Sequence, residues 1–369
     1  MPIKSLHIQH VRNLADVRLT PSPRINIISG DNGSGKTSLL EALHFLGLTR
    51  SFRTGQFRHL LQSGQQRCLV FAQIAPGAED PQRPLGVERQ LDGEVRIRHA
   101  GQTLGLSELA QLLPLQVIDS DTFQLLEGSP GIRRQFIDWG VFHADKGFIQ
   151  LWRGFRRILK QRNSLLKCGK IDPRLRRIWD QEFVAYAEQM TALRAHYIEL
   201  LRPDFEATLG RLLGGVAVEL KFSPGWDRKT PLDQLLEEGL ARDLKQGFTG
   251  SGPQRADLRV RTDGQSAAER LSRGQKKLVV SALKLAQGAL FYRLNNRPCI
   301  YLIDDLPSEL DEQHCRLFCQ FLEETSNQCF ITCVDPAALG GFWLPQTEVS
   351  RFRVDAGKLS HAEIESGDN

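Results

Sequence analysis

The chain has 369 residues, of which 41% are hydrophobic, 25% charged and 8% aromatic. At about 150 residues per domain this length predicts two or three domains, and the composition excludes a disordered, collagen-like or disulfide-built chain. The 48 basic and 43 acidic residues leave a net charge of +5, which suits a polyanionic partner without establishing one. Because no run of about 18 uncharged apolar residues is present and the first residues lack an apolar signal core, we expect a cytoplasmic protein with no membrane partner.

The first hundred residues predict strands around one helix. Residues 3–8 alternate apolar and polar side chains, and residues 24–29 form a short apolar run that ends at a glycine. Residues 37–46 predict a helix, and three strand-like segments follow between residues 67 and 97, separated by turn signals such as Asp92-Gly93. We therefore expect an antiparallel layer beside the first strand–helix unit.

A phosphate-binding motif lies between the second strand and the helix. Residues 30–37 read Gly-Asp-Asn-Gly-Ser-Gly-Lys-Thr, the full G-x-x-x-x-G-K-T pattern in its expected context. The glycines let backbone N–H groups surround phosphates at a helix N-terminus, Lys36 would bridge the β- and γ-phosphates, and Thr37 would ligate Mg²⁺. The sequence thus predicts a purine nucleoside triphosphate site. Its expected contacts are Gly30, Asp31, Asn32, Gly33, Ser34, Gly35, Lys36, Thr37 and Ser38.

From about residue 106 to residue 244 the apolar period becomes helical, with long helices expected over residues 151–166 and 178–201. Gly250-Ser251-Gly252-Pro253 breaks this pattern, and helix–strand alternation then resumes. The order predicts an α/β fold interrupted by a helical insertion. We expect a head formed by residues 1–115 and 251–369, and a basic helical lobe formed by residues 116–250.

The strongest concentration of positive charge in the sequence starts in the first of these expected long helices. Residues 151–177 hold ten Lys or Arg and one acidic residue, a net charge of +9 in a chain whose total is +5. Solvated faces usually mix signs, whereas a face of one sign neutralises successive phosphates whatever the base sequence. We therefore expect DNA contacts opposite the apolar stripe, and regard Arg133-Arg134 as a weaker candidate. The expected DNA contacts are Arg153, Arg156, Arg157, Lys160 and Lys167.

Two later motifs have the residue types expected of a nucleotide site when they are considered together with the phosphate loop. The apolar run at residues 299–303 ends in Asp304, placed to hold a metal ion, and Asp305, placed to polarise an attacking water. Residues 271–275 open a helix with a serine and a glycine, which can offer a hydroxyl and N–H groups to phosphate. Alone, each is a common feature of α/β proteins.

The seven cysteines form no C-x-x-C motif, and we expect reduced thiols. Cys315/Cys319 and Cys329/Cys333 are two C-x-x-x-C pairs that could bind zinc. Each pair lies in an apolar run typical of a buried helix or strand, and burial is the favoured interpretation.

Residues 30–37, 271–275 and 304–305, with Ser308-Glu309-Leu310-Asp311, resemble the Walker A, signature, Walker B and D-loop motifs of ABC-type ATPases. Residues 6–14 resemble the opening of the SMC-like branch, which works on DNA. Residues 126–138, 159–163 and 252–258 extend the resemblance to the RecF family of bacterial recombination mediators, over essentially the whole chain.

This resemblance implies an ABC- or SMC-like ATPase head, with mixed sheets, flanking helices and a compact helical lobe in place of coiled-coil arms. It implies slow, DNA-stimulated ATP hydrolysis with Mg²⁺, in which Lys36 and Asp305 are catalytic, Thr37 and Asp304 hold the metal, and Arg12 and Asn13 lie near the nucleotide.

The resemblance also implies an ATP-dependent homodimer in which each nucleotide lies between one subunit's Walker A motif and the other's signature. Family members bind single-stranded, double-stranded or gapped DNA and act with RecR and RecO to load RecA, in recombinational repair, replication restart and SOS induction. The residues expected to act in trans are Ser272, Arg273, Gly274, Gln275 and Asp311.

Three departures from the family pattern leave roles open. Gln254 stands where the family usually has histidine. Ser120-Asp121 replaces a common Pro-Glu, so the Q-loop residue is either Gln116 or Gln124. Where transporter ATPases carry a switch histidine this chain has Ile331-Thr332-Cys333, so γ-phosphate sensing falls to Thr332 or is absent.

Three other classes explain the sequence less well. A transporter-coupling ATPase would be compact, whereas Gly30 and Ser272 are 242 residues apart, and it would need a switch histidine. A small-molecule P-loop kinase leaves the signature and the +9 segment unexplained. An SMC-type structural ATPase would need sustained heptads, which are absent.

Overall fold

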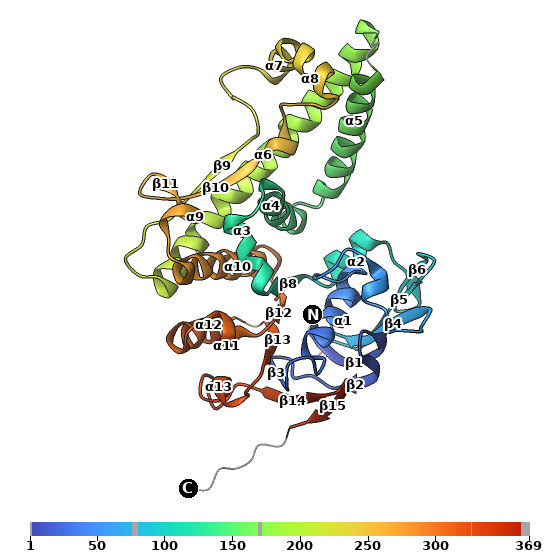
Figure 1. Cartoon of the computed structure of the whole chain (residues 1–369), viewed down its shortest axis with the longest axis vertical. Coiled ribbons are helices and arrows are strands. Elements are labelled where there is room, and N and C mark those ends of the chain that lie inside the picture. The colour runs from blue at the N-terminus through green and yellow to red at the C-terminus, as the bar shows by residue number, and fades with distance from the viewer. Residues whose placement is uncertain (1, 76–79, 169–171, 326, 363–369) are drawn as a thin grey trace. The chain divides into compact units, whose positions relative to one another are not determined.

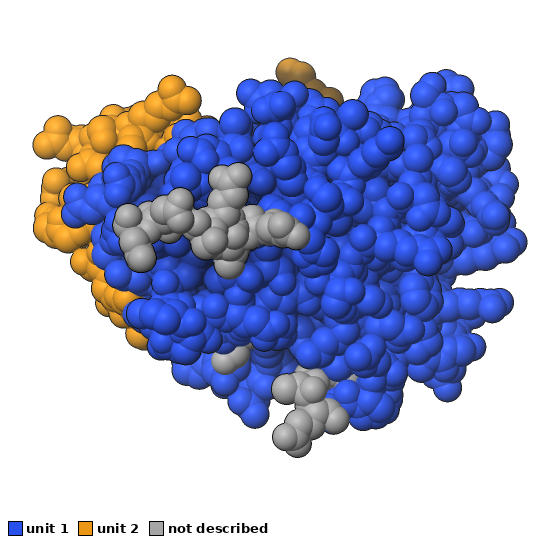
Figure 2. Space-filling model, turned by 90° about the horizontal axis from the view of Figure 1, so that it is seen from below, with its two compact units in different colours: residues 1–122, 291–369 blue, residues 123–290 orange. Residues whose placement is uncertain are grey.

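The computed structural model describes residues 2–75, 80–168, 172–325 and 327–362 (Figure 1). Its chain divides into two compact units (Figure 2). Unit 1 comprises residues 1–122 and 291–369, and unit 2 comprises residues 123–290. The sequence pattern had placed these boundaries at 115/116 and 250/251. The second one differs because residues 257–262 pair with residues 219–223, which keeps the segment after Pro253 in unit 2.

Unit 1 contains two six-stranded sheets. The antiparallel sheet has the order β2-β1-β4-β5-β6-β7, and it is the antiparallel layer expected from the first hundred residues. Its strands are β1 (Ile3–Val11), β2 (Leu14–Leu19), β4 (Arg67–Ile74), β5 (Arg83–Gln90), β6 (Val95–His99) and β7 (Gln102–Thr103).

The second sheet has the order β15-β14-β3-β13-β12-β8 and is parallel except for the β14–β15 hairpin. Its central strands are buried along their whole length, which explains their nearly continuous apolar sequences. The strands are β3 (Ile25–Ser29), β8 (Leu115–Ile118), β12 (Ile300–Ile303), β13 (Gln328–Cys333), β14 (Val349–Asp355) and β15 (Lys358–His361).

Helix α1 (Lys36–Leu48) shares one hydrophobic core with residues of both sheets, so ten of its thirteen residues are buried. A helix that is apolar on nearly all sides needs such a position. The remaining helices of unit 1 are α2 (Leu106–Leu112), α11 (Leu306–Glu309), α12 (Glu312–Glu324) and α13 (Ala337–Gly340), with short 3₁₀ turns at Phe57–His59 and Ser120–Phe123.

Unit 2 is mainly helical, with the small antiparallel sheet β11-β10-β9. Its long helices α5 and α6 pack together, and α10 continues across residue 290 into unit 1. The elements are α3 (Gln124–Glu127), α4 (Pro130–Ala144), α5 (Phe148–Cys168), α6 (Pro173–Leu212), β9 (Glu219–Ser223), α7 (Leu232–Glu238), α8 (Leu240–Gln246), the 3₁₀ turn Pro253–Arg255, β10 (Asp257–Thr262), β11 (Gln265–Ser266), α9 (Ala267–Arg270) and α10 (Arg273–Asn295).

A buried arginine ties unit 2 together. Arg162 on α5 is 2% exposed and donates hydrogen bonds to Asp180 (2.7 Å), Asp243 (3.1 Å) and Thr249 (2.8 Å). These partners lie on α6, on α8 and in the loop after α8. Breaking a buried ion pair leaves an uncompensated charge, so these contacts of Arg162 hold three segments in register. Among the helices that the structure describes, none has the length and apolar character needed to cross a membrane.

Candidate functional site

The phosphate loop connects β3 to α1, and its backbone requires glycine. Gly30, Gly33 and Gly35 have φ values of 149°, 81° and 122°, which other residues rarely adopt. A Cβ atom at Gly30 would lie 2.3 Å from the carbonyl oxygen of Val354, and one at Gly35 would lie 2.9 Å from Nδ2 of Asn13. The loop therefore curls with its N–H groups at the start of a helix, where the helix dipole favours an anion.

Two side chains of the loop, Lys36 and Ser34, are placed to donate hydrogen bonds to a phosphate. The Lys36 ammonium donates to the carbonyl oxygens of Gly30 (2.6 Å) and Asp31 (2.9 Å), so the cation is held over the loop although Lys36 is only 7% exposed. The Ser34 hydroxyl is buried, and no described residue forms a hydrogen bond with it. A buried hydroxyl without a partner is costly, and a bound phosphate oxygen would supply that partner.

The carboxyl end of β12 meets the start of α1. The Thr37 hydroxyl lies 3.0 Å from both carboxylate oxygens of Asp304. A hydroxyl and a carboxylate are the hard oxygen ligands that Mg²⁺ prefers, so these two side chains fit a metal-holding role. The structure thus brings together two residues that are 267 positions apart in the sequence.

Thr332 links the two aspartates at the end of β12. Its hydroxyl donates to Asp304 Oδ1 (2.7 Å) and accepts the backbone N–H of Asp305 (2.8 Å). Asp305 has a left-handed backbone, with φ 52° and ψ 48°, and this hydrogen bond helps to hold it there. Thr332 is 0% exposed, and its hydroxyl hydrogen is already used, so this geometry gives no support to a γ-phosphate-sensing role.

The residues after β1 brace the phosphate loop. Asn13 donates to the Ser34 carbonyl (2.9 Å) and accepts a hydrogen bond from the Ser38 hydroxyl (2.9 Å). Arg12 makes a two-pronged ion pair with Glu41 of α1, at 2.9 and 2.7 Å, and Glu41 is 1% exposed. Asn13 therefore touches the loop directly, whereas the Arg12 guanidinium is engaged in fixing α1.

The β14–β15 hairpin also supports the phosphate loop, at the same Ser34 carbonyl that Asn13 contacts. The Gly357 N–H donates to the Ser34 carbonyl (2.8 Å), and a Cβ atom at Gly357 would lie 2.2 Å from the Asn13 carbonyl oxygen. Neither this hairpin nor Glu41 emerged from sequence reasoning. The hairpin residues show only short alternation, and Glu41 lies in an apolar helix where its ion-pair partner is not visible in the sequence.

The signature residues form the exposed start of α10. Ser272 and Gln275 cap each other, since the Ser272 N–H donates to Gln275 Oε1 (3.0 Å) and the Gln275 N–H donates to Ser272 Oγ (3.3 Å). Ser272, Arg273 and Gly274 are exposed, so this helix N-terminus faces solvent. Asp311, the other residue expected to act in trans, caps α12 by accepting the His314 N–H at 3.0 Å, and these contacts lower its pKa.

The basic face of α5 is exposed as expected. Arg153, Arg156, Arg157, Lys160 and Lys167 all lie at the surface, whereas Phe155, Ile158 and Leu166 are buried. Arg156 lies over the Trp152 ring, 4.8 Å from its centroid, and Arg157 is 3.8 Å from Glu182. Two other cations counted in the +9 segment are structural: Arg162 is buried in its network, and Arg176 pairs with Glu237 at 2.6 Å. Lys170 lies outside the described residues.

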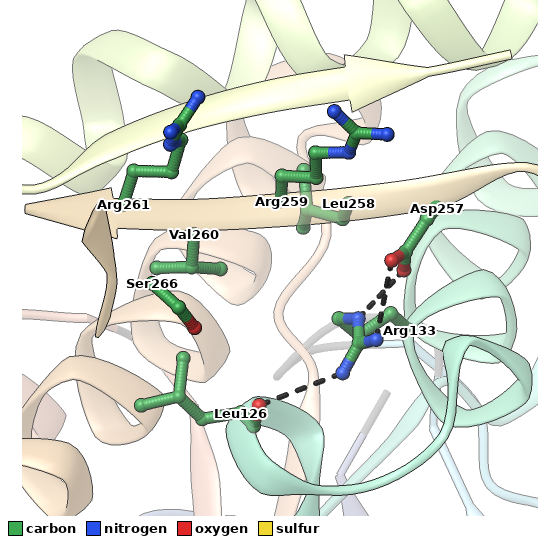
Figure 3. A pocket seen from close by; sticks show the side chains of 8 residues that line it. All are labelled: Leu126, Arg133, Asp257, Leu258, Arg259, Val260, Arg261 and Ser266. Carbon is green, nitrogen blue, oxygen red and sulfur yellow. Dashed lines mark hydrogen bonds and ion pairs between the residues drawn. The ribbon is translucent and has the colours of Figure 1, made fainter. Parts of the chain in front are cut away.

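Arg133 also has a structural role. Its guanidinium binds Asp257 on β10 at 2.6 and 3.2 Å (Figure 3). It also donates to the Gly128 carbonyl at 2.7 Å. Arg134 donates to the Ala256 carbonyl at 2.8 Å. Both side chains therefore join α4 to the segment that starts β10, and neither geometry favours a DNA contact.

The residues left open by the sequence fall in distinct surroundings. Gln254 donates to the carbonyl oxygens of Thr249 (3.2 Å) and Ser251 (3.1 Å), so it stabilises its own turn. Gln116 is 2% exposed within β8, whereas Gln124 begins α3 and is exposed.

The paired cysteines lie on one helix and one strand, all of them buried. Burial raises the pKa of the Cys315, Cys329 and Cys333 thiols to about 12. Thiols in such surroundings stay protonated and pack as small apolar groups, which is the favoured interpretation of the sequence. No metal-binding cluster of His, Cys, Asp or Glu occurs among the residues that the structure describes.

A parallel sheet with a phosphate loop, a facing aspartate and a helical insertion defines an ATPase head of the ABC and SMC type. The family model described as RecF/RecN/SMC N terminal domain matches residues 2–341, and the chain belongs to this family.

Within it, the chain is similar to proteins named "DNA replication and repair protein RecF". It is 48% identical to that of Pseudomonas aeruginosa (strain LESB58) and 49% identical to that of Azotobacter vinelandii, in each case over 361 residues and 98% of both chains.

Solved structures show the same fold. "Structure of the recombination mediator protein RecF-ATP in RecFOR pathway" matches with a TM-score of 0.87 at 23% identity, covering 98% of both chains. An Smc head domain from Pyrococcus furiosus, bound to the C-terminal domain of ScpA, matches with a TM-score of 0.60 at 17% identity, covering 99% of this chain and 97% of that one. The expected ABC/SMC-like fold is therefore confirmed.

Proposed function

We propose that this chain is an ATP-switched DNA-binding clamp of recombinational repair and replication restart, acting in the cytoplasm. The observation that carries the proposal is the phosphate loop, where Lys36 lies over the loop carbonyls and Thr37 contacts Asp304 at the end of β12. The chain that carries it is 48% identical to a RecF protein over 98% of its length. The functional head would comprise residues 1–115 and 251–369, which include the signature, with residues 116–250 as the basic lobe.

The phosphate loop binds the triphosphate of ATP. Backbone N–H groups at residues 30–35 and the Ser34 hydroxyl donate to its oxygens, and the Lys36 ammonium exchanges its carbonyl partners for the β- and γ-phosphates. Thr37 and Asp304 would hold Mg²⁺, which when bound neutralises charge on the phosphates. Asn13 and Ser38 keep the loop in shape, and the remaining loop positions, Asp31 and Asn32, border the nucleotide.

Asp305 accepts a proton from the attacking water during hydrolysis. Its backbone is held by Thr332, which aims the carboxylate from a fixed point at the end of β12. The end of β13 reads Ile331-Thr332-Cys333 in place of a switch histidine, and the Thr332 hydroxyl is already used by the two aspartates. A missing transition-state contact costs up to about 4 kcal/mol, so we expect slow turnover that rises when DNA is bound.

Dimerisation follows from the exposed signature. An exposed helix N-terminus that carries the Ser272 hydroxyl suits the γ-phosphate of a partner subunit's ATP. Arg273, Gly274, Gln275 and the exposed Asp311 are the other residues proposed to act in trans on the partner subunit's nucleotide. ATP would thus join two copies, since it binds the closed dimer with more contacts than the monomer.

The Q-loop residue is proposed to be Gln124 rather than Gln116, because Gln124 is exposed whereas Gln116 is buried.

DNA binding is assigned to the α5 face. Five exposed cations on one helix bind phosphates without reading bases, so the affinity depends on salt. RecR and RecO are the proposed protein partners, as the RecFOR pathway named for the structural relative indicates.

The decisive experiment measures the mass of the Asp305→Asn protein by light scattering, with and without Mg-ATP. We expect a monomer that becomes a dimer with ATP, and a second substitution, Ser272→Arg, should prevent the dimer. Ser266→Arg, at another exposed serine of unit 2, is the matched control and should leave it intact. A mass that does not respond to ATP would refute the shared-nucleotide mechanism.

A further inference from the structure

A hollow on the outer face of the antiparallel sheet is not used by the ATP site or by α5. It measures about 450 Å³, within the rough range of 300 to 1,000 Å³ for ligand pockets. It lies over strands β4, β5 and β6, on the face opposite the buried core residues Val70, Val87 and Ile97. Its lining residues are Leu69, Phe71, Pro84, Gly86, Glu88, Arg96, Arg98, Ala100 and Gly101.

The hollow exists because a glycine occupies the middle of a regular strand. Gly86 pairs with Phe71 on β4 and with Arg98 on β6. Across the three strands, an aromatic side chain and an arginine side chain therefore flank a position that has no side chain. Adjacent strands are about 4.8 Å apart, which separates β4 from β6 by about 9.6 Å. A flat ring that enters the gap therefore meets an aromatic side chain on one side and a cation on the other.

The fold itself does not require glycine at this position. Gly86 is not among the residues with positive φ, and the register of β4 and β5 runs without a bulge. A Cβ atom there would meet only Phe71, at an ordinary contact distance of 3.6 Å. Because glycine weakens a strand interior, a glycine without a backbone reason marks a place where something else comes close.

The cations around the hollow differ in how firmly they are held. Arg67 lies 3.2 Å from Glu88, and Arg96 lies 2.8 Å from Glu94 and 3.9 Å from Glu88. The Arg98 side chain is exposed, and its guanidinium makes no hydrogen bond or ion pair with any residue in the described part of the chain. It is the cation of this group that can bind an outside anion without first giving up a carboxylate.

We propose that this hollow binds one unstacked base of single-stranded DNA, with the Phe71 ring against the base and Arg98 on a neighbouring phosphate. An aromatic ring combined with a cation on an open sheet face is the chemistry that holds single strands regardless of sequence. A protein segment that joins a sheet does so at an edge strand, whereas β4 and β5 are interior strands with both edges paired. This inference rests on the proposed function as a DNA-binding protein and assigns it a separate single-strand subsite.

The test compares a fluorescein-labelled oligonucleotide with a duplex of the same sequence, both measured by fluorescence anisotropy with the full-length protein and Mg-ATP. Phe71→Ala should weaken single-strand binding by about 5- to 150-fold, the range measured for base–aromatic stacking. Gly86→Leu, which fills the gap, should do the same. Neither variant should change duplex binding by more than about twofold, since the duplex is assigned to α5.

Matched variants separate stacking from charge and bulk. Arg18→Ala removes an exposed arginine from the same sheet outside the hollow, and should weaken binding less than Arg98→Ala does. Gln73→Leu places the same leucine side chain on the same face of β4 outside the hollow, and should have no effect. An oligonucleotide containing 2-aminopurine should change its emission on binding to the unmodified protein but not to Gly86→Leu, and thermal unfolding checks that each variant is folded.

The outcomes divide clearly. Unchanged single-strand affinity in both Phe71→Ala and Gly86→Leu overturns the subsite while leaving the proposed function intact if the duplex still binds. Equal losses in Arg98→Ala and Arg18→Ala, with none in Phe71→Ala, would leave only general electrostatic attraction and also overturn it. Loss of binding to a protein partner without loss of single-strand binding would assign the hollow to a peptide instead. A protein that binds neither DNA form fails both proposals.

Discussion

The hydroxyl of Thr332 is expected to contribute to both stability and turnover, and Thr332→Val tests this because valine keeps the shape and loses the hydroxyl. The structure shows two hydrogen bonds that would disappear, one to the Asp304 carboxylate at 2.7 Å and one from the Asp305 N–H at 2.8 Å. A hydrogen bond to a charged group contributes about 1.5–3 kcal/mol and a neutral one about 0.5–1.5 kcal/mol. The free energy of unfolding should therefore fall by about 2–4 kcal/mol.

The catalytic effect should appear in kcat rather than in nucleotide affinity. Asp305 loses the contact that fixes its backbone, and small displacements of a catalytic group cost up to about 100-fold in rate. Lys36 and the loop glycines are untouched, so the Kd for ATP should stay within about threefold. Urea unfolding and a phosphate-release assay measure the two effects. Thr332→Ser keeps the hydroxyl and serves as the control.

Two results would refute this reasoning. If Thr332→Val unfolded at the same urea concentration and turned over ATP at the original rate, the hydroxyl would not be holding the aspartates. If Thr332→Ser lost as much activity as Thr332→Val, packing of the methyl group would be responsible instead.

Three further predictions follow from other parts of the chain. Lys36→Met should abolish ATP binding measured by calorimetry while the circular dichroism spectrum stays the same; an unchanged Kd would contradict the loop geometry. The double substitution Arg156→Ala, Lys160→Ala should lower the slope of log K for duplex DNA against log salt by about 2, and an unchanged slope would exclude α5. Burial lowers the pKa of His44 to about 4, so the unfolded state takes up its proton first as the pH falls. Stability should drop by about 2 kcal/mol between pH 7 and pH 5, and a His44→Gln variant that lost just as much in urea unfolding would assign that drop to other groups.

The nucleotide site was largely predictable because its motifs are local. Residues 30–37 carry their own backbone requirements, and the apolar run before Asp304 has one plausible environment, a buried parallel strand. The bracing of the site was not predictable. The pairing of Arg12 with Glu41, and of Thr332 with Asp304, depends on contacts across 29 and 28 residues that no spacing rule encodes.

Unit 2 shows the opposite balance. The apolar stripe and the exposed cations of α5 followed from helical periodicity, but the same count included Arg162, which is buried. A charged residue on a helix is normally exposed. Arg162 is buried because Asp180 and Asp243, from other segments, form hydrogen bonds with it. Strands β9 and β10 were missed because short strands after helices leave a weak alternating signal.

The central position of β3 has a consequence for how the protein is made. β3 ends at residue 29, yet its two neighbours in the sheet, β13 and β14, begin at residues 328 and 349. The hairpin contact from Gly357 to Ser34 comes later still. On a ribosome, the strand that leads into the proposed ATP site therefore cannot form its sheet pairs until residues 328–355 have been synthesised. A truncated product would carry an intact phosphate motif and still be unable to hold ATP.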